Sequence, residues 1–454
     1  TTLSIHPVTP GANNLAPSPD GKYVFIYHDV DGPEQLGPGS DQELTVLVVA
    51  TGETHAMTVG AHPREVVFAT DNSAAWVITA AGINVIGLDT VDMVGKPPLV
   101  PVVADPGIDP ATLEVQVVAS EGIALARVDG QPWLAVTDLK QAKLTVLDLP
   151  GVPTDLDIAP AGGFAVLTIP DQAGSSFLEL PLPLVGGGEF KTFVVDGEYV
   201  GQSAIAQSGD AMLLFTTVDP FASTRDPALD LAIWSNVGAS TGSSSSTSTS
   251  TSTSTSTSTD TGTSTDTGAS GDTGTSTDTG GEAPVGDPRQ RITLARRAGA
   301  DWNLVTLFVD VPVTSVGVAP DSRSAVLIHA VDDANAAAPW SYSLFDLSPA
   351  FPLIKRQTTE AKPGPVLFTP DGGRAAVLLR DDATNVKKVD LVDLGNFIVD
   401  SLLLGSPPEG AGHVDATQKI FVSQEHPSGR ITFVGPDGAV QTVTGYVLND
   451  SVKD

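Results

Sequence analysis

Short apolar runs separated by polar turns recur along most of the chain. The stretch "LAPSPDGKYVFIYHD" (15–29) is typical, because two apolar runs flank a Pro-Asp-Gly turn. Gly supplies the positive φ that such a turn needs, and the Asp side chain bonds its own backbone. The pattern predicts a β-hairpin, and its recurrence predicts an all-β chain of many short strands.

Eight copies of this hairpin pattern can be aligned. Their turns are 39 to 52 residues apart, except for one spacing of 112 that contains a Ser/Thr-rich segment of about 50 residues. A period of about 40–50 residues is typical of a β-propeller. Further apolar runs follow most copies, so we expect four-stranded blades. The copies are 15–29, 66–80, 115–138, 156–170, 204–218, 316–330, 366–380 and 413–425.

The blade count is eight on this alignment, and seven stays open. The copy around Glu121 is irregular and lacks an obvious fourth strand. Residues 2–7 have the same layout as the strand that precedes the hairpin of 316–330. We therefore expect the N-terminal segment to complete the C-terminal blade, so that strands from both ends close a single ring and remove its exposed edges.

Three of the motifs resemble a known family. "SPDGKYVFI" (18–26), "TPDGGRAAVLL" (369–379) and "VVATGET" (48–54) are similar to the repeats of bacterial YVTN and TolB-like (WD40-like) β-propellers. The resemblance covers nearly the whole chain outside the Ser/Thr-rich segment. It implies the fold, but these motifs are blade signatures and identify no active site.

The Ser/Thr-rich segment divides the chain. We expect a first part of the propeller over 1–238 (blades 1–5), a Ser/Thr/Gly/Asp insertion over 239–288, and the rest of blade 5 with blades 6–8 over 289–454. The run "RITLARRAGADWNLVTLFV" (291–309) fits the outer hairpin of blade 5, which puts the insertion after that blade's second strand. If "LDLAIWS" (229–235) is the third strand instead, the insertion leaves from the opposite face.

Alternating Ser and Thr has no apolar face to bury, so we expect the insertion to be disordered. Dense hydroxyl groups are also typical of O-glycosylated stalks. The candidate glycosylation sites are Ser243, Thr247, Thr249, Thr251, Thr253, Thr255, Thr257 and Thr259.

Composition restricts the partners. Lys plus Arg is 23 against 54 Asp plus Glu, a formal charge of −31, and the chain outside 239–288 still carries −25. Nucleic acid is therefore a poor partner, because binding it needs clustered cations. There is no cysteine and no run of 18 apolar residues, which argues against thiolate chemistry and a membrane-spanning helix. The chain begins at Thr1, so we expect any secretion signal to have been removed or never included.

Candidate metal ligands gather in loops predicted for one face of the ring. Five of seven histidines precede a first strand or follow a second strand, and acidic residues share these loops. Imidazole and carboxylate together suit a divalent cation, either calcium or another metal. The alternative is that these are solvated polar loops that bind no metal. The candidate ligands are His28, Asp29, Asp31, His62, His413, Glu425 and His426.

The sequence favours a non-catalytic function. "GQSAI" (201–205) lacks the last Gly of a serine-hydrolase elbow, and no other catalytic motif is recognised. We expect an exported bacterial propeller, secreted, periplasmic or at the cell surface, that binds protein partners or acts as a scaffold. A lactonase-like or other metal-assisted hydrolase at the His/Asp face is one alternative. A structural subunit of an extracellular assembly or fibre is another.

The glycosylation hypothesis predicts the mass of the protein isolated from its source. We expect an intact mass above 46.6 kDa, with the excess confined to peptides from 240–282. Mass spectrometry before and after O-deglycosylation measures it. A mass equal to that of the unmodified chain would contradict the glycosylation hypothesis.

Overall fold

The structure is a computed structural model. It describes residues 7–30, 41–92, 95–105, 107–171, 174–184, 189–196, 199–216, 290–309, 311–331, 339–347, 352–414 and 417–445. These residues form 32 β-strands and two single 3₁₀ turns, η1 (Leu88–Thr90) and η2 (Pro110–Thr112). Among them, no helix has the length and hydropathy needed to span a membrane.

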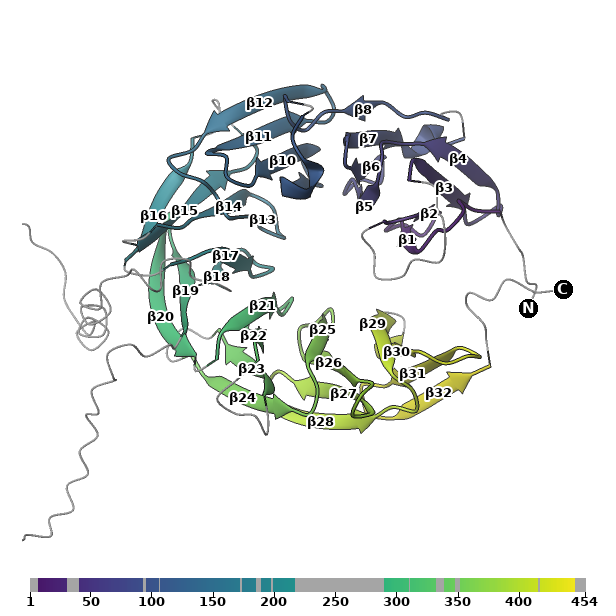
Figure 1. Cartoon of the computed structure of the whole chain (residues 1–454), viewed down its shortest axis with the longest axis vertical. Coiled ribbons are helices and arrows are strands. Elements are labelled where there is room, and N and C mark those ends of the chain that lie inside the picture. Colours follow the sequence, from purple (N-terminus) through teal and green to yellow (C-terminus); the bar gives the residue numbers. More distant parts are fainter. Residues whose placement is uncertain are drawn as a thin grey trace, which may run out of the picture. The chain divides into compact units, whose positions relative to one another are not determined.

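The strands form eight antiparallel sheets of four consecutive strands each, arranged in a ring as in a β-propeller (Figure 1). Blade 1 contains β1 (Asn14–Pro17), β2 (Tyr23–Tyr27), β3 (Glu43–Val48) and β4 (Thr54–Thr58); blade 2 contains β5 (Pro63–Phe68), β6 (Ala74–Thr79), β7 (Gly82–Gly87) and β8 (Leu99–Val100). Blade 3 contains β9 (Leu113–Val118), β10 (Ile123–Val128), β11 (Trp133–Asp138) and β12 (Lys143–Asp148); blade 4 contains β13 (Asp155–Ile158), β14 (Phe164–Ile169), β15 (Gly174–Pro181) and β16 (Lys191–Asp196).

The second half of the ring repeats this order. Blade 5 contains β17 (Gln202–Ile205), β18 (Ala211–Phe215), β19 (Gln290–Ala298) and β20 (Asp301–Val309); blade 6 contains β21 (Val313–Val318), β22 (Ser324–His329), β23 (Trp340–Asp346) and β24 (Ile354–Thr359). Blade 7 contains β25 (Pro363–Phe368), β26 (Arg374–Asp381), β27 (Val386–Asp393) and β28 (Ile398–Leu403); blade 8 contains β29 (Pro408–Val414), β30 (Lys419–Gln424), β31 (Arg430–Val434) and β32 (Val440–Thr444).

The described strands form eight blades. Each of the eight predicted turns connects the first and second strands of one blade, so the alignment of the repeats is confirmed. The irregular copy around Glu121 is a complete blade, with β12 as its fourth strand. Blade 8 takes all four of its described strands from 408–444. Of the segment 2–7 that we expected to complete it, residues 2–6 lie outside the described residues.

Buried apolar clusters between neighbouring blades form the core. Strand β6 shows how alternation produces them: Ala75 and Val77 pack into the cluster with blade 1, while Trp76 and Ile78 pack into the cluster with blade 3. The same arrangement joins each consecutive pair from blade 1 to blade 8. The middle strands of blades 2 to 7 are therefore largely apolar on both faces, because both faces are covered, whereas β30 of blade 8 buries alternate residues.

Blade 5 is built from two distant parts of the chain. Strand β19 pairs with β18 in antiparallel register, with Leu214 opposite Thr293, and β20 completes the sheet. The segment containing the insertion thus joins the second strand to the third, as the outer-hairpin assignment of 291–309 predicted. The alternative third strand at 229–235, the insertion at 239–288 and the candidate glycosylation sites all lie outside the described residues.

A buried ionic contact holds the outer hairpin of blade 5 against blade 4. The Glu179 carboxylate on β15, only 6% exposed, accepts hydrogen bonds from Arg297 (2.5 Å) and from the indole nitrogen of Trp302 (2.7 Å). The Arg297 guanidinium lies 4.0 Å from the centre of the Trp302 ring and 4.7 Å from that of Phe164. Each polar group in this apolar seam therefore has a partner.

This contact predicts a large effect of replacing Glu179 with Ala. The substitution leaves a mostly buried guanidinium and an indole N–H without their acceptor, so we expect the free energy of unfolding to fall by about 3 kcal/mol. Urea denaturation measures the loss. Glu189→Ala, at an exposed position of the same blade, is the control and should change stability by less than about 0.5 kcal/mol. Equal effects of the two substitutions would contradict the assignment.

Candidate functional site

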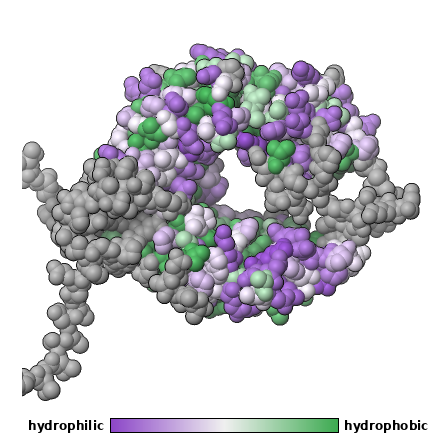
Figure 2. Space-filling model, viewed as in Figure 1, coloured by the Kyte–Doolittle hydropathy of each residue, from purple (hydrophilic) through white to green (hydrophobic). Residues whose placement is uncertain are grey.

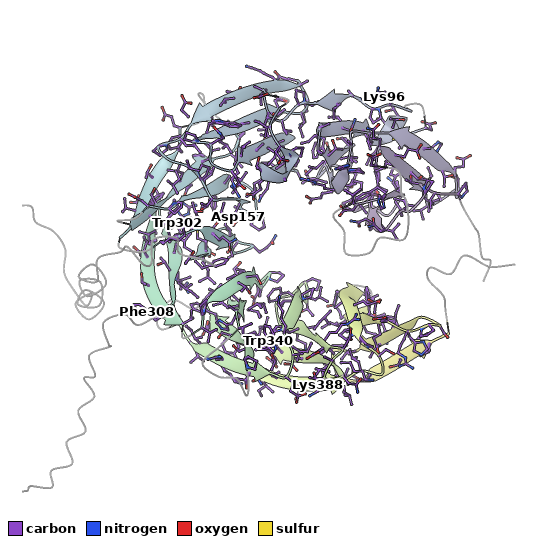
Figure 3. All side chains as sticks on the ribbon, in the orientation of Figure 1. Lys96, Asp157, Trp302, Phe308, Trp340 and Lys388 are labelled. Carbon is purple, nitrogen blue, oxygen red and sulfur yellow. The ribbon has the colours of Figure 1, made fainter. Side chains whose placement is uncertain are left out.

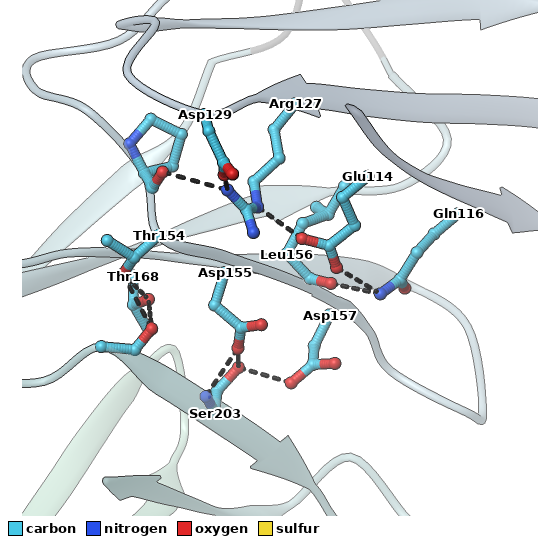
Figure 4. A network of polar contacts seen from close by, with 12 residues as sticks. Glu114, Gln116, Arg127, Asp129, Thr154, Asp155, Leu156, Asp157, Thr168 and Ser203 are labelled. Atoms are coloured by element: carbon cyan, nitrogen blue, oxygen red, sulfur yellow. Dashed lines mark hydrogen bonds and ion pairs between the residues drawn. The ribbon is translucent and has the colours of Figure 1, made fainter. Parts of the chain in front are cut away.

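The first strand of each blade lies nearest the centre of the ring (Figure 1), and the space-filling view shows an opening there (Figure 2). These innermost strands are strongly acidic. They carry one arginine, Arg64, against five carboxylates, on Glu65, Glu114, Asp155, Asp157 and Glu409. Three of these acids belong to a polar network between blades 3, 4 and 5, which we call the inner-wall cluster. It consists of Glu114, Gln116, Arg127, Asp155, Asp157 and Ser203 (Figure 4).

Strand alternation places two carboxylates of this cluster side by side. Asp155 and Asp157 are two residues apart on β13 and therefore lie on the same face of the strand. Leu156 between them is fully buried in the cluster shared with blade 3. Both carboxylates contact Ser203 of β17, in blade 5. Figure 3 shows that Asp157 lies closer to the centre of the ring than Trp302 does.

Ser203 connects the two carboxylates. Its backbone N–H donates to Asp155 Oδ2 at 2.7 Å, and its Oγ lies 3.2 Å from the same oxygen. The same Oγ lies 2.6 Å from Asp157 Oδ2. Burial and the negative charge of Asp155 raise the pKa of Asp157 to about 7, although the Ser203 contact opposes the rise. Burial also raises the pKa of Asp155.

Blade 3 holds the other side of β13. The Gln116 side chain donates to the carbonyl of Leu156 and accepts from the N–H of Ile158 (3.2 Å). The amide group thus bonds the exposed backbone of β13 in the way that a neighbouring strand would. Because strands of different blades do not pair, this side chain satisfies backbone groups at the inner edge of the sheet.

Arg127 is the cation of the inner-wall cluster. From β10 it forms ion pairs with Glu114 and with Asp129 (2.7 Å), and it donates to the carbonyl of Pro153. Burial raises the pKa of Glu114, and Arg127 partly opposes the rise. A single arginine therefore faces three acids of the cluster and also pairs with Asp129. The local charge is negative when all four acids are ionised.

A groove lies beside the cluster. Its volume is about 640 Å³, and residues from β5, β9 and the end of blade 4's first hairpin line it. Two of its lining residues, Glu65 and Glu114, carry carboxylates, and many of the others are aliphatic. The groove thus offers acidic groups next to apolar surface, the combination that suits a cationic group on an aliphatic stem. Its lining includes Glu65, Val67, Glu114, Gln116, Ile158 and Gly162.

The predicted metal ligands of the first two blades lie in local contacts. His28 is buried and its Nδ1 donates to the Gly11 carbonyl at 2.7 Å. The backbone N–H of Asp29 donates to Asn13, and Asp31 lies outside the described residues. His62 has a positive φ of 53° and lies 3.8 Å from Asp41 Oδ2, a residue the sequence analysis did not select.

Two of the predicted ligands of blade 8, Glu425 and His426, follow the end of β30, whereas His413 lies near the opposite end of the first hairpin. Glu425 forms a 2.6 Å ion pair with Arg380, and His426 Nδ1 accepts from the N–H of Ser428. We expected His413 before an innermost strand, yet it lies within β29, next to the end that carries the turn. Within the described part of the chain, no three His, Asp or Glu side chains form a metal-binding group. The seven-residue metal site stays a prediction.

The sequence analysis did not select the inner-wall cluster. The signal was present as acid, apolar, acid in "DLDI" (155–158) at the start of a repeat whose other copies are largely apolar there. Nothing local identifies Ser203 or Gln116 as partners, because they come from the blades on either side.

Comparison with known proteins supports the fold. No protein-family model matches the chain, and no curated protein sequence matches it significantly. A solved eukaryotic initiation factor shares 13% identity over 96% of this chain and 91% of its own, with a TM-score of 0.54. Apo AztD from Citrobacter koseri shares 12% identity (89% and 92% covered, TM-score 0.46), and the Dos1 propeller shares 10% (81% and 74%, 0.44).

The eight four-stranded sheets identify a β-propeller, and the comparisons identify nothing narrower. At 13% identity the likeness to the initiation factor concerns the fold alone, and we infer nothing from TM-scores below 0.5. Membership of the bacterial YVTN/TolB-like family stays a prediction.

The ion pair of Arg127 predicts a pH-dependent loss of stability in Arg127→Leu. Without the guanidinium, the pKa of Glu114 in the folded chain rises further above its unfolded value. The folded state then holds this proton to higher pH than the unfolded chain does, so stability falls as pH rises above about 4.5. We expect a loss of about 2 kcal/mol at pH 8 and a smaller one at pH 5.

Urea unfolding at the two pH values measures this difference. Arg127→Lys, which keeps the charge, should lose less at pH 8 than Arg127→Leu does. A loss that is identical at both pH values would mean that Arg127 acts through packing alone.

Proposed function

We propose that this protein is a non-catalytic binding module, and that the acidic inner wall receives a positively charged segment of a partner protein. The observation that carries the proposal is the charge imbalance on the innermost strands, where five carboxylates accompany one arginine. Clefts lined by one sign of charge focus the electrostatic field and concentrate ligands of opposite sign.

The inner-wall cluster supports a Lys or Arg side chain as the group recognised. Asp155 and Asp157 are half-buried and held by Ser203, so little side-chain entropy remains to be lost on binding. Two carboxylates on one strand face offer several acceptor oxygens to the fork of a guanidinium or to an ammonium group. The groove with Glu65 and Glu114 lies beside the cluster and offers aliphatic surface and carboxylates to a neighbouring basic side chain of the same segment.

Two features of the sequence support a location outside the cytoplasm. The chain contains no cysteine in 454 residues, which suits an oxidising compartment where free thiols react. Its Ser/Thr-rich segment has the composition of exported, O-glycosylated stalks. On this proposal the partner is an extracellular or periplasmic protein with a basic segment.

Binding of model peptides tests the proposal. We expect a fluorescent Arg/Lys peptide to bind the full chain with an affinity that falls as salt rises, and a Glu peptide of equal length not to bind. The double variant Asp155→Asn/Asp157→Asn should weaken binding by roughly tenfold or more, because charge-assisted hydrogen bonds are lost. Fluorescence anisotropy measures both affinities.

A matched control separates the inner wall from the general negative charge. Asp148→Asn/Asp301→Asn removes two carboxylates from the outer strands of blades 3 and 5 and should leave the affinity within about twofold. Equal losses in the two double variants would mean that the peptide responds only to the net charge of −31. That result, or an absence of binding, would overturn the proposed site.

A further inference from the structure

Ser203 contacts two carboxylates, and the number of protons that these three groups share determines which of the contacts are hydrogen bonds. Asp155 Oδ2, Ser203 Oγ and Asp157 Oδ2 form a chain of three oxygens, with separations of 3.2 and 2.6 Å. A hydroxyl group donates one hydrogen and accepts others. If both carboxylates are ionised, the serine proton satisfies only one of the two contacts.

One additional proton, carried by a carboxyl group, allows both contacts to be hydrogen bonds. Asp155 Oδ2 also accepts a hydrogen bond from the backbone N–H of Ser203 at 2.7 Å, so the negative charge is better stabilised on Asp155 than on Asp157. With a proton on Asp157, its O–H donates to Ser203 Oγ, and Ser203 donates to Asp155. Both contacts are then hydrogen bonds, and the 2.6 Å separation is in the range of a strong O–H···O bond.

The surroundings favour keeping this proton. Asp157 is faced by Asp155 on its own strand and by Glu114 and Gln116 from β9. Arg127 of β10 pairs with Glu114 and Asp129 and donates to Pro153. Ser203 is the group that faces it from β17. Burial and the charge of Asp155 accordingly raise the pKa of Asp157 to about 7.

The same contacts form part of the junction between blades 4 and 5. At the inner edge, Ser203 of β17 contacts the carboxyl pair of β13. A second link lies beside it, where the Thr154 hydroxyl donates to the Gly201 carbonyl at 2.7 Å. Thr168 of β14 donates to the same carbonyl at 3.0 Å. The two threonines do not titrate, so only the link through the carboxyl pair depends on pH.

We propose that Asp155, Ser203 and Asp157 form a pH-sensitive switch that closes the inner junction of blades 4 and 5 with one shared proton. When pH rises, the Asp157 proton leaves to water, the Ser203 hydroxyl turns to Asp157, and Asp155 loses its hydroxyl donor. Two neighbouring anions then repel, the junction loosens, and the inner wall gains one negative charge. The switch requires no ligand; its effect on binding rests on the proposed function.

Infrared difference spectroscopy of the ligand-free full chain tests for the proton directly. Spectra at pH 5.5 and pH 8.5 should differ by a protonated-carboxyl C=O band that is missing in Asp157→Asn. Asp148→Asn, on an exposed outer strand, should keep the band. If wild type and Asp157→Asn give the same difference spectrum, the shared proton is refuted.

Stability against pH tests the consequence for the fold. The folded state holds the Asp157 proton up to about pH 7, whereas an unfolded Asp releases it near its ordinary pKa of 3.8. Between these values the folded state binds more protons, so the wild-type folding equilibrium constant should fall by up to roughly tenfold per pH unit, and level off above pH 7. Asp157→Asn should lack this slope, and an unchanged slope would overturn the switch.

Two further variants separate a switch from a merely structural contact. Asp155→Asn removes the neighbouring anion and should move the transition to lower pH without abolishing it. Ser203→Ala should remove the pH dependence of amide hydrogen exchange in β17, after correction for the intrinsic rate. If the transition of Asp155→Asn occurs at the same pH as that of the wild type, the proposal is overturned. None of these measurements uses a peptide, so the switch and the proposed binding function can fail separately.

Discussion

Burial of sheet faces between neighbouring blades is the constraint on which the rest of the structure depends. A four-stranded sheet has two faces, and in blades 2 to 7 each face is covered by the adjacent sheet. Strands such as β14 and β22 are consequently buried along their whole length. Many polar groups lie in the loops and on the innermost strands, and a polar group buried between sheets needs a partner, as Glu179 has in Arg297 and Trp302. The acids of the inner wall stand in one of the few places that the packing leaves open to them.

Much of the fold followed from the repeated hairpin, because a turn such as that around Pro19 or Asp371 is a local signal. Polar turn residues and flanking apolar runs lie within one short stretch, so eight copies identify eight blades. Blade 3 was the difficult case. Its turn at Glu121 and Gly122 lacks proline, yet β9 and β10 pair without interruption, because packing against blades 2 and 4 compensates for the weaker turn.

The candidate site was harder to predict because its parts come from three blades. Asp155 and Asp157 are visible in the sequence as a pair of acids on one strand face. Their meaning depends on Ser203, which only the ring brings to them. Conversely, His413 was expected in a loop, and β29 extends through it. Residue type predicted metal chemistry for the histidines, and that stays a prediction. The structure adds the local contacts of some of them, such as that of His28 with the Gly11 carbonyl.

The connection of β18 to β19 has a consequence for how the chain folds during synthesis. Blades 1 to 4 are complete well before Trp302 is made, yet Trp302 packs against Phe164 and Phe177, on the face of blade 4 that blade 5 covers. Strands β17 and β18 of blade 5 precede the insertion and cover part of that face, with Met212 and Leu214. The part that Trp302 contacts stays exposed while the long Ser/Thr-rich stretch is synthesised. From Ser243 to Glu282 the stretch has Ala269 as its only apolar side chain, so it has little apolar area with which to cover this surface. The composition of the insertion thus keeps that surface available for the hairpin that belongs there.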